Sequence, residues 1–98
     1  MWRHGDVLIA VADAIPKDAR ALPHCVLAEG ETTGHAHRIE GGGLADLFEL
    51  RGERFLHITA ESARLIHEEH KPIILPRGVY RVWIQREYTP TAIVPVRD

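Results

Sequence analysis

The sequence has a single cysteine, Cys25, among its 98 residues. One thiol cannot form an intrachain disulfide, so nothing indicates a secreted domain stabilised by disulfides. Zinc sites built from several thiolates are excluded for the same reason. Cys25 lies between apolar residues in HCVLA, and we expect it to pack as a small hydrophobic side chain.

Long apolar runs and an excess of either charge are also missing. No run approaches the roughly 20 apolar residues of a membrane helix. The N-terminal segment MWRHGDVLIAVADAIP lacks the long apolar stretch and small-residue cleavage site of a signal peptide. The formal net charge of -2 and the pI of about 6.4 give no overall attraction to nucleic acid or anionic membranes. We expect a soluble, cytoplasmic protein without a membrane partner.

No stretch keeps the apolar period of an amphipathic helix over three turns. Short apolar runs recur instead, separated by glycine, proline or charged pairs, as in small β domains. A length of 98 residues fits one domain. The sequence therefore predicts one all-β domain over residues 1–98, a small barrel or sandwich of six to eight short strands. The runs lie at residues 6–12, 24–30, 35–40, 44–50, 54–60, 63–68, 78–88 and 91–96.

The segment GVYRVWIQREY (78–88) alternates as a half-buried strand does. One face carries the side chains that we expect to be buried, Tyr80, Val82 and Ile84. The other face carries side chains that we expect to be exposed, Arg81, Gln85 and Glu87. Arg86 and Tyr88 continue the buried face beyond its apolar part. This placement predicts a polar mouth or cavity at the end of the strand.

Two histidines, His35 and His37, lie one residue apart in the glycine-rich segment GETTGHAHRIEGGG. On a strand they share a face with Ile39, so both imidazoles point inward if Ile39 does. Two imidazoles side by side on a sheet are a usual way to bind one metal ion. Glu31 and Glu40 flank the pair and are available as carboxylate ligands. The simpler alternative is a polar loop in which two histidines happen to be close.

A second pair of histidines occurs in HEEH (67–70). On a strand His67 shares a face with Glu69, whereas on a helix it shares a face with His70. Pro72 argues against a helix across this point and predicts that a strand ends there. We therefore expect a strand rather than a short helix in TAESARLIHEEH. The alternative is a solvated charged turn, and the spacing of the HExxH zinc-protease motif is absent.

Some of these segments resemble known motifs. GETTGHAHRIEGGG resembles the first cupin motif, in which Gly is followed by His-x-His, Glu and Gly. ILPRGVYRV (74–82) is predicted to form a strand, a Pro-x-Gly turn and a strand, and it resembles the turn of the second cupin motif. The spacings differ from the cupin pattern, and Arg81 stands where the cupin histidine is expected. The resemblance to cupins is therefore one of architecture.

A closer resemblance involves six blocks taken as a set. They resemble a family of small bacterial and phage proteins that has no assigned activity. The resemblance spans nearly the whole chain and implies a single domain with a site built from these blocks. The blocks are GDVLI, GETTGHAH, HEEH, LPRGVYRV, QREYTP and VRD.

The first functional hypothesis is a metal-binding β domain. Zn, Mn, Fe or Ni would suit imidazole and carboxylate ligands. Glu69 or Glu40 would be a fourth ligand or a general base, and Arg86 and Tyr88 would orient a small anionic substrate. An open coordination position would make the domain a hydrolase or an oxygenase, whereas a closed one would be structural or sensory. The expected metal ligands are His35, His37, His67 and His70.

Two alternatives belong to other functional classes. A metal-independent ribonuclease would use one histidine of each pair as general base and general acid. Lys71 and Arg86 would bind the phosphate of the RNA substrate, and Tyr88 would stack on a base or donate a proton. A non-catalytic adaptor or inhibitor domain would instead use Trp2 and Trp83 as exposed contact residues. The sequence does not determine the oligomeric state.

Overall fold

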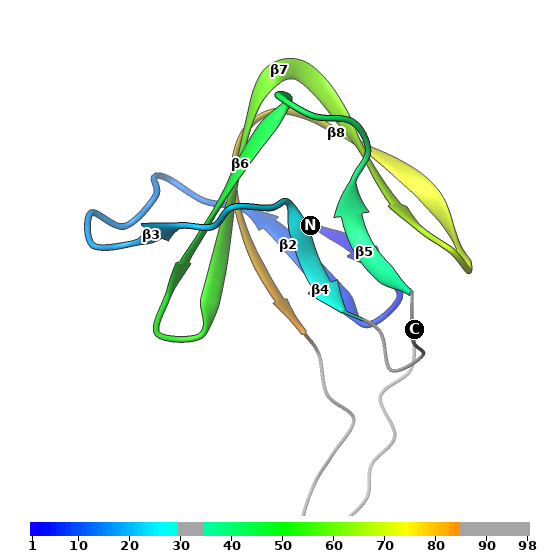
Figure 1. Cartoon of the computed structure of the whole chain (residues 1–98), viewed down its shortest axis with the longest axis horizontal. Coiled ribbons are helices and arrows are strands. Elements are labelled where there is room, and N and C mark those ends of the chain that lie inside the picture. Colours follow the sequence, from blue (N-terminus) through cyan, green and yellow to red (C-terminus); the bar gives the residue numbers. More distant parts are fainter. Residues whose placement is uncertain (30–34, 85–98) are drawn as a thin grey trace, which may run out of the picture.

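A computed structural model describes residues 1–29 and 35–84. In these residues the chain forms eight strands and no helix, which confirms the predicted all-β class. The strands form one antiparallel sheet that curls into an open half-barrel (Figure 1). They are β1 (Trp2–His4), β2 (Val7–Val11), β3 (Arg20–Ala21), β4 (Val26–Glu29), β5 (Ala36–Ile39), β6 (Ala45–Leu50), β7 (Glu53–His67) and β8 (His70–Ile84).

The order of strands across the sheet is β1-β2-β8-β7-β5-β4. β6 pairs with the first part of β7, and β3 pairs with β6. β5 pairs with the last part of β7, so the two halves of β7 have different neighbours. The expected apolar run at residues 91–96 lies outside the described residues. No helix in the described part of the chain is long and apolar enough to cross a membrane.

β7 and β8 contain 15 residues each and are longer than the short strands that the sequence predicts. Two apolar runs, at 54–60 and 63–68, join in β7 because a bulge separates them rather than a turn. From Ile58 to Ser62 β7 advances four residues, while its partner β8 advances only two, from Gly78 to Pro76. Extra residues in one strand bend it and increase its twist. The bulge therefore curls the long β7–β8 hairpin, as the bend beside the β7 label in Figure 1 shows.

The predicted Pro-x-Gly turn at 76–78 is wrong, because β8 runs through it without interruption. Gly78 lies opposite Ile58, at the edge of the bulge in β7. Arg77 donates a hydrogen bond from Nε to the carbonyl of Ala60 in that bulge, at 3.2 Å. Proline is tolerated in strands at such irregular positions. Pairing with β7 thus keeps this turn-like sequence in the extended conformation of a strand.

The apolar face of β8 agrees with the predicted alternation for two of three residues. Tyr80 and Val82 are buried, and Arg81 is exposed. Ile84 is 37 % exposed, so its predicted burial is wrong. The last pair between β7 and β8 is Arg54 with Val82, and Ile84 therefore extends past the start of β7. The other two residues of the predicted exposed face, Gln85 and Glu87, lie outside the described residues.

Three other side chains pack in ways that bear on the predictions. Cys25 is half-buried against the core, as expected, and its Sγ lies 3.2 Å from the carbonyl oxygen of Ala45. Trp2 and Trp83 are half-buried rather than exposed. Trp2 packs edge-on against Tyr80 with ring centroids 5.4 Å apart, and the Arg81 guanidinium lies over the Trp83 ring. Trp2 and Trp83, the contact residues expected for an adaptor, therefore pack against other residues of the domain itself.

Candidate metal centre

Five of the seven histidines gather at one end of the half-barrel. There the two-residue turns after β1 and β7 meet the start of β5. Distances between neighbouring ring centroids run from 4.3 Å to 6.3 Å. We call this group the histidine cluster, and its members are His4, His35, His37, His67 and His70.

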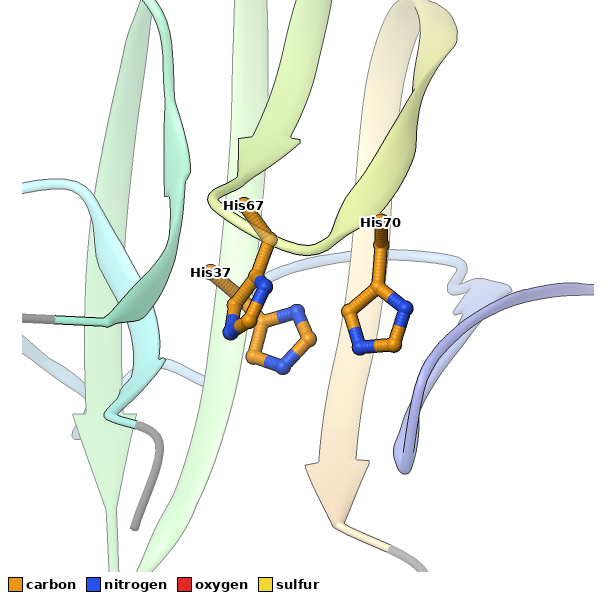
Figure 2. A group of neighbouring side chains, drawn as sticks. All are labelled: His37, His67 and His70. Atoms are coloured by element: carbon orange, nitrogen blue, oxygen red, sulfur yellow. The ribbon is translucent and has the colours of Figure 1, made fainter. Parts of the chain in front are cut away.

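The HEEH segment is neither a continuous strand nor a helix, because Glu68 and Glu69 form a tight turn between β7 and β8. His67 and His70 are direct cross-strand partners on either side of this turn. Partners that lie opposite each other project their side chains on the same face. Their ring centroids are 4.6 Å apart, and Figure 2 shows one of the two rings at each end of the turn.

The sequence predicts that a strand ends at Pro72, and this prediction is wrong. β8 continues through Pro72, which lies in a second bulge. From His70 to Ile73 β8 advances three residues, while β7 advances two. A bulge leaves a residue unpaired, so the missing N–H of proline costs no ladder hydrogen bond there. The carbonyl of Lys71, next to this proline, accepts a hydrogen bond from Nε2 of His4 at 3.0 Å.

His37 and Ile39 are both buried on β5, as their shared face predicts. The His37 ring stacks at 5.6 Å from His70 and lies 4.3 Å from His67 (Figure 2). One ring nitrogen from each of these three histidines lies within 4.8 Å of the other two. An ion that binds imidazole at about 2.0–2.1 Å holds its tetrahedral ligand atoms roughly 3.4 Å apart. Small side-chain movements therefore suffice to place one ion among them.

A chain of hydrogen bonds sets the protonation of His37. The Lys71 carbonyl only accepts, so Nε2 of His4 carries a proton, and Nδ1 of a neutral His4 is then an acceptor. Nδ1 of His4 lies 2.9 Å from Nδ1 of His37, which must donate across this contact. The remaining lone pair of His37 is on Nε2, 3.7 Å from Oδ1 of Asp6. The buried ring therefore presents the free nitrogen that a metal ion requires.

Both buried histidines are neutral around pH 7. Burial, together with the neighbouring rings of His67, His4 and His70, lowers the pKa of His37 to about 4. Burial also lowers the pKa of His4, an effect larger than the opposing one of its hydrogen bond with Lys71. Metal ions compete with protons for imidazole nitrogen. A metal ion at His37 would have no proton to displace at neutral pH.

His67 uses its free nitrogen in the turn itself. Its Nδ1 accepts a hydrogen bond from the backbone N–H of Glu69 at 3.0 Å. A neutral imidazole has one lone-pair nitrogen, so this hydrogen bond occupies the position that a metal ion needs. Metal binding at His67 would therefore exchange the turn hydrogen bond for a metal–nitrogen bond.

A second set of close ligand atoms comprises His35, His67 and Glu68. Glu68 accepts hydrogen bonds from the Ala36 backbone N–H at 3.0 Å and from Arg38 at 2.9 Å. The backbone hydrogen bonds, led by that of Ala36, and the Arg38 contact lower the pKa of Glu68 to about 2. Both carboxylate oxygens are thus engaged, and Glu68 fastens the β7–β8 turn to β5. We therefore regard His37, His67 and His70 as the better ligand set.

The other residues proposed from the sequence are dispersed. His35 lies at the rim, with Nδ1 3.7 Å from the largely exposed Glu69 carboxylate. Glu40 is not at the site predicted for it, because it pairs with Arg64 at 3.2 Å on the exposed surface. Lys71 contributes its carbonyl, and its residue is exposed. Glu31, Arg86 and Tyr88 lie outside the described residues.

The sequence predictions missed His4 and Asp6. His4 is 3 % exposed, and Asp6 lies in the two-residue turn that follows it. Gly5 occupies the first position of that turn with a φ of 66°, a conformation that glycine adopts freely. Trp2 and His4 alternate on one face before a Gly-Asp turn, and this pattern could have indicated an inward-pointing histidine.

Comparison with known proteins identifies a family without assigning a role to the site. The model of a family described as a domain of unknown function, DUF8820, matches residues 3–85. The matched segment contains every member of the histidine cluster. No curated protein and no solved structure matches the chain.

Proposed function

Because the chain belongs to the DUF8820 family, a family of unknown function as the sequence predicted, we propose its function from the site itself. The proposal is that the domain binds one divalent transition-metal ion through His37, His67 and His70. The observation that carries it is the convergence of three imidazole nitrogens within 4.8 Å, from β5 and from both arms of the β7–β8 hairpin.

The donor set favours particular ions. Three imidazoles without a thiolate suit Zn²⁺, Ni²⁺, Co²⁺ or Fe²⁺, whereas Mg²⁺ and Ca²⁺ prefer oxygen ligands. Nitrogen donors also make Mn²⁺ the weakest of the ions expected from the sequence. When bound, such an ion supplies Lewis-acid chemistry. His70 is exposed and Asp6 lies at the rim, so solvent can reach one side of the site.

Hydrolysis of a small anionic substrate in the cytoplasm remains a prediction of the sequence. It depends on Arg86 and Tyr88 to orient the substrate, and both lie outside the described residues. Metal binding is the step that the described geometry supports, and an enzymatic activity would be built on it.

The ribonuclease alternative has less support. A general acid at neutral pH needs a pKa near 7, and His37 has a pKa of about 4. Of the two phosphate-binding residues predicted from the sequence, Lys71 alone lies within the described residues. We therefore keep RNA cleavage as an outcome of the experiment rather than as a second proposal.

The test is a titration of tag-free protein, stripped with EDTA, with Zn²⁺, Ni²⁺ and Co²⁺. We expect one ion per chain, and we expect His37→Ala, His67→Ala or His70→Ala to weaken binding by at least about 100-fold. His24→Ala is the matched control, because His24 is exposed and bonds only to the backbone N–H of Val26 among the described contacts. An intense visible absorption band of bound Co²⁺ would indicate a four-coordinate site.

Two results would reject the proposal. The first is a wild-type protein that binds none of these ions, and the second is equal binding by wild type and the three cluster variants. Cleavage of a mixed RNA pool in EDTA, abolished by His37→Ala or His67→Ala, would establish the ribonuclease instead. If neither metal binding nor cleavage is found, the adaptor hypothesis replaces both.

A further inference from the structure

His4 joins two parts of the sheet that strand pairing keeps apart. In the strand order, β2, β8 and β7 all lie between β1 and β5. The contact between Nδ1 of His4 and Nδ1 of His37 nevertheless connects the end of β1 to β5 at 2.9 Å. Both side chains are buried at 3 % exposure. A buried polar contact of this kind needs all its partners, because an unpaired nitrogen there would cost free energy.

We infer that His4 is the positioning residue of the metal centre and holds His37 in the orientation that points Nε2 at the ion. This inference rests on the metal-binding function proposed above. Metal-bound histidines usually donate their second ring N–H to a fixed acceptor, which sets both the tautomer and the ring angle. His4 supplies that acceptor, and the Lys71 carbonyl in turn fixes the tautomer of His4.

His4 itself is not placed to bind the ion. One of its nitrogens faces the Lys71 carbonyl and the other faces His37. No lone pair of the neutral ring remains for a metal. The assignment therefore separates two roles within the histidine cluster, three rings that bind and one that orients.

The turn after β1 keeps His4 in place and closes one side of the site. A Cβ atom added to Gly5 would lie 2.6 Å from Nε2 of His70 and 3.2 Å from Cε1 of His37. The backbone of the turn therefore packs directly against two of the three proposed ligands. Because His4 precedes this turn and Val7, its cross-strand partner, is fully buried, the ring has a rigid base.

The first experiment reads the tautomer of His37 in the metal-free wild-type protein by ¹⁵N NMR of the imidazole nitrogens. We expect a proton on Nδ1 of His37 and on Nε2 of His4 at pH 7. A proton on Nε2 of His37 instead would overturn the inference. This measurement needs neither a variant nor a bound ion, so it remains valid even if the proposed metal binding fails.

The second experiment compares the Zn²⁺ affinity of His4→Phe and His4→Gln with that of the wild type. Phenylalanine keeps the ring volume but cannot accept a hydrogen bond, and we expect affinity to fall about 10- to 100-fold. Glutamine can still accept from His37, and we expect it to restore part of this loss. His24→Phe is the matched control and should bind as the wild type does.

The outcomes separate the two claims. If the wild type binds no ion, the proposed function fails, and the tautomer measurement then decides only whether His4 fixes the orientation of His37. If the wild type binds Zn²⁺ and a folded His4→Phe binds it equally well, the positioning role is rejected while the metal site stands. If His4→Phe does not fold, a His4→Gln variant that binds more than about 100-fold weaker than the wild type would reject the role.

Discussion

A single buried imidazole makes the metal-free domain sensitive to pH. The pKa of His37 is about 4 in the folded protein, against about 6.5 in an unfolded chain. Between these values the unfolded state takes up a proton that the folded state does not, so stability decreases as the pH falls. The contribution is fully present above about pH 6.5 and is lost by about pH 4. It amounts to about 3 kcal/mol.

We therefore expect the urea midpoint in EDTA to fall between pH 7.5 and pH 4.5. His37→Asn should remove much of this dependence, because asparagine is polar but does not titrate. His4 has a lowered pKa as well and should account for part of what remains. The same slope in wild type and His37→Asn would contradict the assignment.

Among the elements, the turns show most clearly what the sequence could reveal. Short apolar runs correctly predicted strands in the segments that became β2, β4, β5 and β6. The HEEH turn could be stated only as an alternative to a strand, because it has no glycine, asparagine or proline of its own. Glu68 is held instead by Ala36 and Arg38, which lie about 30 positions earlier in the sequence. A turn stabilised by distant residues leaves no local signal.

The difference between local and long-range contacts also explains which residues of the site could be predicted from the sequence. His35, His37, His67 and His70 could be singled out because each pair is compact in sequence. His4 could not, because its partner is 33 positions away and only the curled sheet brings them together. That curl follows from bulges in β7 and β8, which depend on the pairing of strands and not on residue type alone.

Two turns that each contain a glycine with positive φ provide a test of the site at the level of elements. Gly5 and Gly52 have φ angles of 66° and 84°, so alanine at either position is strained by about 1 kcal/mol. A Cβ on Gly52 would meet nothing within 4 Å, whereas one on Gly5 would press on His70. We expect both variants to lose stability, Gly5→Ala the more because of its contact with His70, but only Gly5→Ala to lose Zn²⁺ affinity, by more than about tenfold. Thermal unfolding measures the stability of the two variants, and calorimetric titration measures their Zn²⁺ affinity. Unchanged affinity in Gly5→Ala would show that the turn does not border the site.

At the scale of the whole molecule, the half-barrel is completed by side chains rather than by a closed ladder. Arg54 of β7 donates hydrogen bonds to the carbonyls of Val26 and Leu27 on β4, at 2.7 Å and 3.1 Å. These contacts engage carbonyls of an edge strand, which would otherwise be open to other chains. The histidine cluster performs the corresponding task between β1 and β5. A bound ion would reinforce the second of these closures.

We therefore expect metal to stabilise the molecule as a whole. An ion at 100 times its Kd adds about 2.7 kcal/mol, which for a domain of this size raises Tm by roughly 10–20 °C. Hydrogen exchange should slow most in β1, β5 and the ends of β7 and β8 beside their turn. His37→Ala, titrated in the same way, should show neither effect. Stabilisation of that variant equal to the wild type would place the ion elsewhere.

The spread of the site along the chain has a consequence for biosynthesis. The hydrogen bond that anchors His4 joins it to Lys71, 67 positions further on. A ribosome adding about 5–20 residues per second needs several seconds to cover that distance. In the second half of this interval His4 and His37 have both been synthesised, but neither His67 nor His70 has. The nascent chain therefore holds no complete ligand set, and the ion can be acquired only when translation of the described strands is nearly finished.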